Sequence, residues 1–266
     1  MSLADKTAVI VGGGSGIGRR VALEFASEGA KVVVGDFYLE FAEKTASEIK
    51  SRGGKALGLK IDIRSEAEIK DMVKKALEGF GTIDILVNVT RAASLVKMVD
   101  LSEEQWDTVV DYNAKGVFFL CKAVAREMVK NNRGKIIIVS STAGVSGQEQ
   151  LSHYAASMGA VIGFTRSLGL ELAGKNIKVN IICPGFIENT ELKLGAQLKA
   201  GPPVDEDTIV LFSPLHQIEG EPEAIAKMAV FLASERGDYF SSETYRLWDD
   251  EVTFSRNMTI VTKKAL

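Results

Sequence analysis

The stretch that decides the fold is "TAVIVGGGSGIGRRVALEFASEGAKVVVGD", residues 7–36. An apolar run over residues 7–11 meets a glycine-rich loop, an amphipathic segment runs from Arg19 to Glu28, and a second apolar run covers residues 31–35. Short, continuous apolar runs rich in Val and Ile are typical of strands that are buried on both faces. The stretch therefore predicts a strand, a helix and a second strand, with the glycines at the turn from strand to helix.

The same alternation continues to the end of the chain. Further predicted strands cover residues 56–61, 83–88, 135–140 and 177–182, and residues 244–249 are a candidate for a last one. Amphipathic segments between them predict helices over residues 39–52, 65–79, 103–130 and 152–173, and Glu221-Pro222 is typical of a helix start. This pattern predicts an α/β fold with a doubly wound parallel sheet flanked by helices. Because no Pro/Ser-rich linker interrupts it, we expect a single domain over residues 1–266.

One segment departs from the alternation. Three of the five prolines, Pro202, Pro203 and Pro214, fall between residues 190 and 222. We expect a lid segment near residues 190–218. Its apolar side chains suit a substrate with a hydrophobic part, although such residues also pack against a neighbouring helix.

Composition excludes several classes of protein. Hydrophobic residues make up 46% of the chain, charged residues 25%, and the formal net charge is −3, which is typical of an ordinary globular protein. Without a basic block, we expect no nucleic acid and no membrane among the partners. No run is long enough to span a membrane, and no signal peptide is evident. The two cysteines and two histidines lack the spacing of metal ligands, so we expect no metal and a reducing, cytoplasmic location.

The glycine loop predicts a phosphate-binding turn. In "VGGGSGIGRR" the glycines lie at positions 12, 13, 14, 16 and 18, so the backbone can turn sharply and approach a ligand closely. The free N–H groups at the start of the next helix suit a pyrophosphate. Asp36, eighteen residues after Gly18, ends the second strand, where an acid accepts hydrogen bonds from ribose hydroxyls and repels a 2′-phosphate. NAD is therefore the expected cofactor, and a solvated acid in a turn is the alternative.

In these motifs the chain resembles the short-chain dehydrogenase/reductase family. The resemblance rests on "GGGSGIG", "DILVN", "YNAKGVFFLCK", "IIIVSSTAG", the tyrosine of "HYAAS", "VNIICPGFI" and "EPEAIAKMAVFLAS", in that order over nearly the whole chain. It implies a Rossmann-like fold, a dimer or tetramer built through the two long helices, here about 103–130 and 152–173, and hydride transfer between a nicotinamide cofactor and an alcohol or ketone.

The resemblance also assigns site residues. Tyr154 takes the position of the catalytic acid/base, Ser141, thirteen residues earlier, that of the substrate-binding serine, and Asn113 that of the asparagine holding a relay water. The implied cofactor-binding residues are Gly12, Ser15, Gly16, Ile17, Gly18, Asp36, Asp62, Asn88, Pro184 and Ile187. On its residues alone, Asp62 either contacts adenine or caps the helix that begins near Ser65.

Two departures from the family pattern bear on chemistry. Met158 stands four residues after Tyr154, where the family has a lysine, and Arg91 stands at a glycine position. An unperturbed tyrosine has a pKa near 10, so if oxidation needs the phenolate the lost cation costs about 4 kcal/mol, roughly a thousandfold in rate. Arg91 is a candidate substitute cation, with a surface or pyrophosphate-facing arginine as the alternative.

Three functions follow from this pattern. The first is an NAD-dependent oxidoreductase acting on a small alcohol or ketone, with a hydrophobic or acyl part, as a homo-oligomer. The second is a catalytically inactive subunit in a hetero-oligomer with an active homologous dehydrogenase. The third is a dinucleotide-binding protein without turnover.

Overall fold

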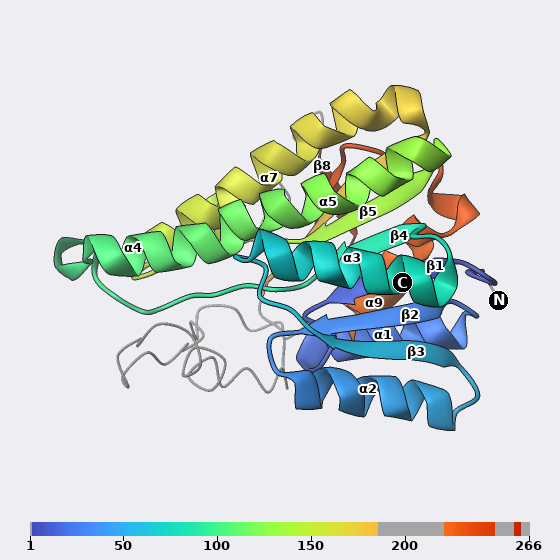
Figure 1. Cartoon of the computed structure of the whole chain (residues 1–266). Helices are drawn as coiled ribbons and strands as arrows, with labels where there is room; N and C mark the ends of the chain where they lie inside the picture. The colour runs from blue at the N-terminus through green and yellow to red at the C-terminus, as the bar shows by residue number, and fades with distance from the viewer. Residues whose placement is uncertain (1, 186–220, 248–257, 262–266) are drawn as a thin grey trace.

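The fold is built on one parallel sheet. The computed structural model describes residues 2–185, 221–247 and 258–261 (Figure 1). The strands are β1 (Thr7–Val11), β2 (Lys31–Asp36), β3 (Lys55–Lys60), β4 (Ile85–Asn88), β5 (Gly134–Val139), β6 (Ile177–Pro184), β7 (Thr244–Leu247) and β8 (Met258–Val261). Their order in the sheet is β3-β2-β1-β4-β5-β6-β7-β8, and every neighbouring pair is parallel.

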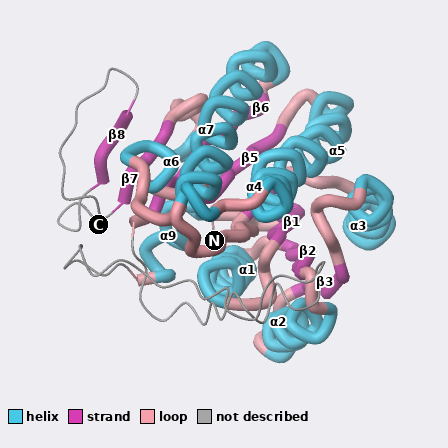
Figure 2. The backbone as a smooth tube through the Cα atoms, turned by 90° about the vertical axis from the view of Figure 1, so that its left-hand side faces the viewer, coloured by secondary structure: helices cyan, strands magenta, loops and turns pink. Residues whose placement is uncertain are grey.

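Helices cover both faces of this sheet. On one face lie α1 (Gly16–Ser27), α2 (Leu39–Ser51) and α9 (Pro222–Ala233), and on the other lie α3 (Glu66–Phe80), α5 (Gly116–Asn131) and α7 (Ser152–Leu172) (Figures 1 and 2). Ile10 packs into the first layer and Val9 into the second. Because neighbouring residues of a strand point to opposite faces, both must be apolar, which explains the continuous apolar runs.

The sheet changes direction next to β1. From β1 the chain adds β2 and β3 on one side, then crosses to β4 on the other. At the carboxyl ends, Val11 lies opposite Gly35 of β2 and Asn88 of β4. In open parallel sheets ligands bind at this switch point, outside the carboxyl ends of the strands. The fold therefore brings the glycine loop, Asp36 and Asn88 to one edge.

The predicted helix over 103–130 is interrupted. It consists of α4 (Glu103–Val110), a π turn, η2, over Asp111–Lys115, and then α5. Ser102 and Gln105 form a capping box at the start of α4. π turns insert one extra residue into a helix and often mark functional sites, and this one carries Asn113.

Other expectations are met or lie outside the described residues. The predicted strands are present with bounds shifted by a few residues, and α9 begins at Glu221-Pro222 as expected. The strand β8 was not predicted, although its Thr, Ile and Val are typical strand residues. The lid segment near 190–218 lies outside the described residues. Within the described ranges, no helix is long and apolar enough to cross a membrane.

Candidate active site

The glycine loop joins β1 to α1 in a turn where several of the glycines leave no room for a Cβ. A Cβ on Gly18 would lie 1.9 Å from the carbonyl oxygen of Gly12, and Gly12 itself has a φ of +80°. Ser15 is the N-cap residue of α1, and its side chain makes no capping hydrogen bond. The first-turn amides of Gly16, Ile17 and Gly18 have no earlier helical carbonyl to bond, so this helix end suits an anionic group.

Asp36 ends β2 directly under this loop. The side chain is buried, and its Oδ2 accepts a hydrogen bond from the Gly14 amide at 2.9 Å while Oδ1 accepts one from Tyr38 at 3.1 Å. Burial raises the pKa of Asp36, which these backbone amides partly oppose. A carboxylate has about four acceptor positions, so this one keeps capacity for ribose hydroxyls.

Asn88 ends β4 on the other side of β1. Its Oδ1 accepts from the Thr90 hydroxyl at 2.9 Å, whereas its buried Nδ2 has no hydrogen-bond partner within residues 2–185, 221–247 and 258–261. A buried donor without a partner is costly. Among the described residues, this orphaned donor at the switch point indicates a site that a ligand completes.

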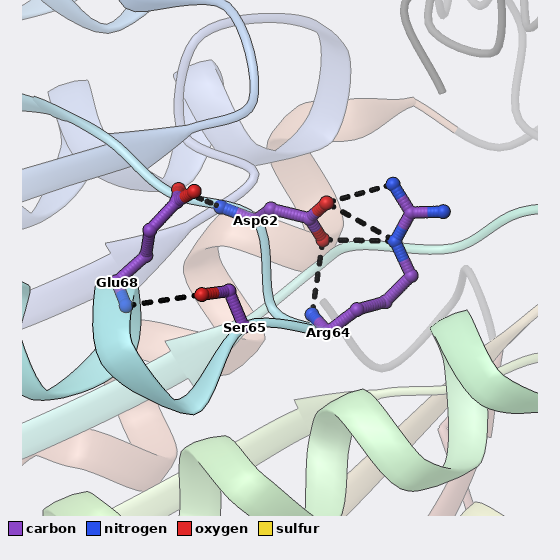
Figure 3. Close-up of polar contacts among 4 residues, drawn as sticks. All are labelled: Asp62, Arg64, Ser65 and Glu68. Carbon is purple, nitrogen blue, oxygen red and sulfur yellow. Dashed lines mark hydrogen bonds and ion pairs between the residues drawn. The ribbon is translucent and has the colours of Figure 1, made fainter. Parts of the chain in front are cut away.

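Asp62 follows β3 at the same edge, but its carboxylate faces a neighbour in the chain. Arg64 donates to it from the backbone and from the guanidinium, and the shortest contact, from Nη2 to Oδ2, is 2.7 Å (Figure 3). The helix cap considered for Asp62 is supplied by Ser65, whose hydroxyl accepts from the Glu68 amide. Asp62 thus lies at its predicted edge with its side chain already engaged.

Asn113 ties the π turn to the rest of the site. Its Oδ1 accepts from the Ala92 amide at 2.7 Å, and its Nδ2 donates to the Ala92 carbonyl and to the Ser157 hydroxyl, both at 2.8 Å. Ser157 in turn donates to the Tyr154 carbonyl at 2.7 Å. Asn113 therefore fixes both the loop after β4 and the first turn of α7.

Tyr154 lies in the first turn of α7, buried in an apolar cluster with Ala93, Val109, Ala143, Leu151 and Met158. Within the described part of the chain, its hydroxyl forms no hydrogen bond. Ser141 follows β5, and its Oγ accepts from the Ala143 amide at 3.2 Å. The short α6 (Ala143–Ser146) packs against α7, which brings the serine and tyrosine segments together (Figure 2).

Met158 is packed as an apolar residue. It is 2% exposed, and the Ser140 hydroxyl contacts both its carbonyl oxygen at 3.2 Å and its Sδ at 3.6 Å. A thioether offers neither charge nor a strong donor. The position one turn below Tyr154 therefore holds no cation.

Arg91 lies in the loop after β4, beside the glycine loop. The neighbouring Thr90 Cγ2 would lie 3.1 Å from a Cβ on Gly12, and Ala92 is held by Asn113. Arg91 is half-exposed, and no hydrogen bond or ion pair to its guanidinium is found among the residues that the structure describes. Arg91 thus lies between two residues that are held against the glycine loop and against Asn113.

His153 has a structural contact that the sequence did not reveal. The fully buried ring places Nε2 2.8 Å from the Ser94 hydroxyl, and its Nδ1 has no partner among the described residues. Burial lowers the pKa of His153. The pair joins the loop after β4 to the start of α7 beside Tyr154.

The residues present fit a dinucleotide. Four features lie together at the carboxyl ends of the strands: the glycine loop, the uncapped start of α1, the free acceptor capacity of Asp36 and the unpaired Nδ2 donor of Asn88 among the described residues. Pro184 is buried at the end of β6, and Ile187 lies outside the described residues. No group of three or more His, Cys, Asp or Glu side chains able to hold a metal is found in the described ranges.

Comparison with known proteins decides the family. The model of the short chain dehydrogenase family matches residues 6–199. The chain belongs to this family. Its relatives include a 3-oxoacyl-[acyl-carrier-protein] reductase of Thermotoga maritima, 37% identical over 91% of this chain and 96% of the relative. Another is the BbsD subunit of the (2S)-[(R)-hydroxy(phenyl)methyl]succinyl-CoA dehydrogenase of Thauera aromatica, 36% identical over 91% of this chain and 95% of the relative.

A solved structure shares the fold. The crystal structure of an NAD+-bound xylitol dehydrogenase superposes with a TM-score of 0.81 at 27% identity, covering 92% of this chain and 98% of that one. Membership of an oxidoreductase family and a Rossmann-like architecture are thereby shown. The predicted family and fold class are confirmed.

Several residues that shape the site were not predicted. Ser157, Ser140 and Ser94 supply the contacts described above, and Arg64 engages Asp62. The Ser157 contact could have been expected from the sequence, because a serine in a helix can donate to the backbone carbonyl of a residue three positions earlier, here Tyr154. The others join segments far apart in sequence or depend on rotamers, which no spacing rule predicts.

Proposed function

We propose that this chain binds NAD(H) and transfers hydride between the nicotinamide and an alcohol or ketone, with Tyr154 moving the proton. The observation that carries the proposal is the contact chain Asn113–Ser157–Tyr154 at the same sheet edge as the glycine loop and Asp36. Bound NAD(H) would accept or supply the hydride. Ser141 would hydrogen-bond the substrate oxygen, and the Tyr154 hydroxyl would donate or receive its proton.

The missing cation makes the two directions of reaction unequal. A phenol without a cationic neighbour is almost fully protonated at pH 7. Reduction of a ketone uses this protonated form directly, whereas oxidation of an alcohol needs the phenolate. We therefore infer that ketone reduction with NADH is the favoured direction at neutral pH.

The substrate class follows from the relatives. Two of them, by their names, act on acyl groups carried by a protein or by coenzyme A. We infer a small oxo-compound with an acyl, thioester-linked part. Purified protein with NADH and a panel of 3-oxoacyl thioesters and plain ketones should show loss of NADH absorbance. A Tyr154→Phe variant should bind NADH equally and lose turnover. Absence of turnover with every compound would count against the proposal.

The preference for NAD over NADP rests on Asp36. A 2′-phosphate would meet this acid under the loop, where charge repulsion and desolvation oppose binding. NADH should bind measurably in a calorimetric titration, and NADPH at least tenfold more weakly. In Asp36→Ala the ratio of the NADPH dissociation constant to the NADH dissociation constant should be smaller. Equal affinities in the wild-type protein would contradict the role of Asp36.

A second candidate is a non-catalytic subunit that pairs with an active homologue. It is favoured by the buried Met158 and by a relative that is itself named as a subunit of a dehydrogenase. Purification from the native cell should then yield a second family member that carries the lysine. A pure homo-oligomer that turns over would exclude this role.

A further inference from the structure

A cavity of about 650 Å³ opens at the amino ends of the strands, at the opposite edge of the sheet from the glycine loop (Figure 1). Its walls come from the segment before β1, the starts of β4 and β5 and the turn after α9. It shares no residue with the proposed NAD(H) site. A volume of this order suits a small organic molecule. The charged residues that line it are Lys6, Asp84, Arg133, Lys135, Glu235, Arg236 and Asp238.

The acid in the wall between β1 and β5 is already neutralised. The Asp84 side chain is buried, its Oδ2 accepts a hydrogen bond from the Thr7 amide at 2.9 Å, and its Oδ1 lies 2.9 Å from Nη2 of Arg133. A guanidinium has five N–H donors, and this one spends only the Nη2 end on Asp84. Because the Arg133 side chain is 54% exposed, its other donors can reach a ligand in the cavity.

A second ion pair joins β5 to the turn after α9. The ammonium of Lys135 lies 2.5 Å from Oδ1 of Asp238 and donates to the Ser234 carbonyl at 3.3 Å. Burial lowers the pKa of Lys135, which the hydrogen bond to Asp238 opposes. The walls are therefore linked by charge pairs within the fold, and the cavity is formed before any ligand arrives.

Two further cations of the lining are not used by the fold. Lys6 and Arg236 make no ion pair and no side-chain hydrogen bond among the residues that the structure describes. The acid of the lining that is left without a cation there is the exposed Glu235. The unpaired charge of this recess is therefore positive, on a chain whose net charge is −3. A recess lined by one sign of charge concentrates ions of the opposite sign.

We propose that this cavity binds a small organic anion that carries a phosphate or carboxylate group, with Arg133, Arg236 and Lys6 as its donors. The planar fork of an arginine matches the paired oxygens of either group, and a lysine adds a point charge. The cavity is larger than an inorganic ion needs, so the anionic group is expected to be part of a larger polar molecule. The inference does not depend on the proposed NAD(H) chemistry.

The test is a calorimetric titration at low salt with three probes of similar size: glucose 6-phosphate, citrate and uncharged glucose. The wild-type protein should bind at least one of the two anions with a Kd of about 1 mM or tighter and should not bind glucose measurably. The affinity should fall as salt is added, because the contacts are ionic. Binding of glucose 6-phosphate alone assigns a phosphate site, and binding of citrate alone assigns a carboxylate site.

The double variant Lys6→Gln with Arg236→Gln should weaken anion binding tenfold or more. The matched control is Lys44→Gln with Lys50→Gln, which removes two exposed cations on α2 that are likewise without an ion pair among the described residues. It should bind the anion within about twofold of the wild type. Thermal unfolding of both double variants should match the wild type, since the exchanged side chains hold no contact of the described fold.

Two results would overturn the proposal. One is that neither anion binds to the wild-type protein, or that glucose binds as well as they do. The other is that the Lys6→Gln, Arg236→Gln variant binds the anion as tightly as the wild type, which would place the anion elsewhere, such as the start of α1. The titrations contain no dinucleotide, so a failure of NADH to bind would contradict the proposed function and leave this result unchanged.

Discussion

Tyr154 and Met158 are the two residues on which the proposed chemistry depends most. The backbone carbonyl of Tyr154 accepts a hydrogen bond from Ser157, whose hydroxyl in turn accepts one from Asn113. Met158 fills the space below it with an apolar side chain. In the proposed reaction Tyr154 would therefore transfer the proton without a neighbouring cation at position 158 to favour its phenolate.

His153, the neighbour of Tyr154, should make stability depend on pH. Burial lowers its pKa in the folded protein, so between about pH 6.5 and that lower value the unfolded chain binds the extra proton. The contribution of the neutral His153 ring to the free energy of unfolding is fully present above pH 6.5. It is lost as the pH falls below that value, at up to about 1.4 kcal/mol per pH unit. Chemical unfolding of wild type and His153→Gln from pH 7.5 to 5 measures the difference in slope.

Carboxylates titrate in both the wild-type protein and His153→Gln, so their effect on the slope of unfolding free energy against pH cancels when the two slopes are compared. Ser94→Ala, which keeps the histidine and removes its partner, is the control and should retain the steeper slope. Identical slopes in wild type and His153→Gln would show that the ring takes up its proton in the folded state.

At the scale of elements, the junctions between strand and helix are the most constrained parts of the molecule. The turn from β1 to α1 and the packing of α6 on α7 both depend on glycines. A Cβ on Gly144 would lie 2.7 Å from the carbonyl carbon of Met158, as the two helices touch there. A conservative substitution at such a position therefore lowers stability more than most surface substitutions do.

Gly18→Ala and Gly163→Ala form a matched pair of helical glycine substitutions. The first would place a Cβ 1.9 Å from the Gly12 carbonyl oxygen, whereas the second meets nothing within 4 Å. Gly18→Ala should lower stability by about 2 kcal/mol or more and weaken NADH binding strongly. Gly163→Ala should raise stability by about 0.5–1 kcal/mol. Thermal unfolding and NADH titration test both; equal effects would contradict the close approach in the loop.

For the whole molecule, much could be predicted from the sequence because the sheet is buried on both faces. Continuous apolar runs located six strands, residues 244–249 were a candidate for a seventh, and Gly18 and Asp36 marked the switch point. The π turn around Asn113 could not be predicted, because a helical pattern does not reveal one inserted residue. The Arg64–Asp62 contact depends on one rotamer in a short turn. The assigned roles of Ser141 and Tyr154 stay predictions, as does the cytoplasmic location.

The chain is predicted to form an oligomer through α5 and α7. Phe118 on α5 is 40% exposed and stands edge-to-face with Phe164 of α7, on the two helices expected to form the interface. Phe118→Asp should reduce the mass measured by light scattering to that of a monomer. Tyr239→Asp, at a 94% exposed position outside these helices, should not. A wild-type monomer would contradict the predicted oligomer.

The central claim is that this is a complete hydride-transfer site that lacks only its cation, and Met158→Lys tests it most directly. Rates of NAD-dependent alcohol oxidation are measured in wild type and variant, with NADH affinity determined in parallel. The account predicts that oxidation rises by up to about a thousandfold at pH 7, while ketone reduction changes much less. Unchanged oxidation in a folded variant that still binds NADH would contradict it.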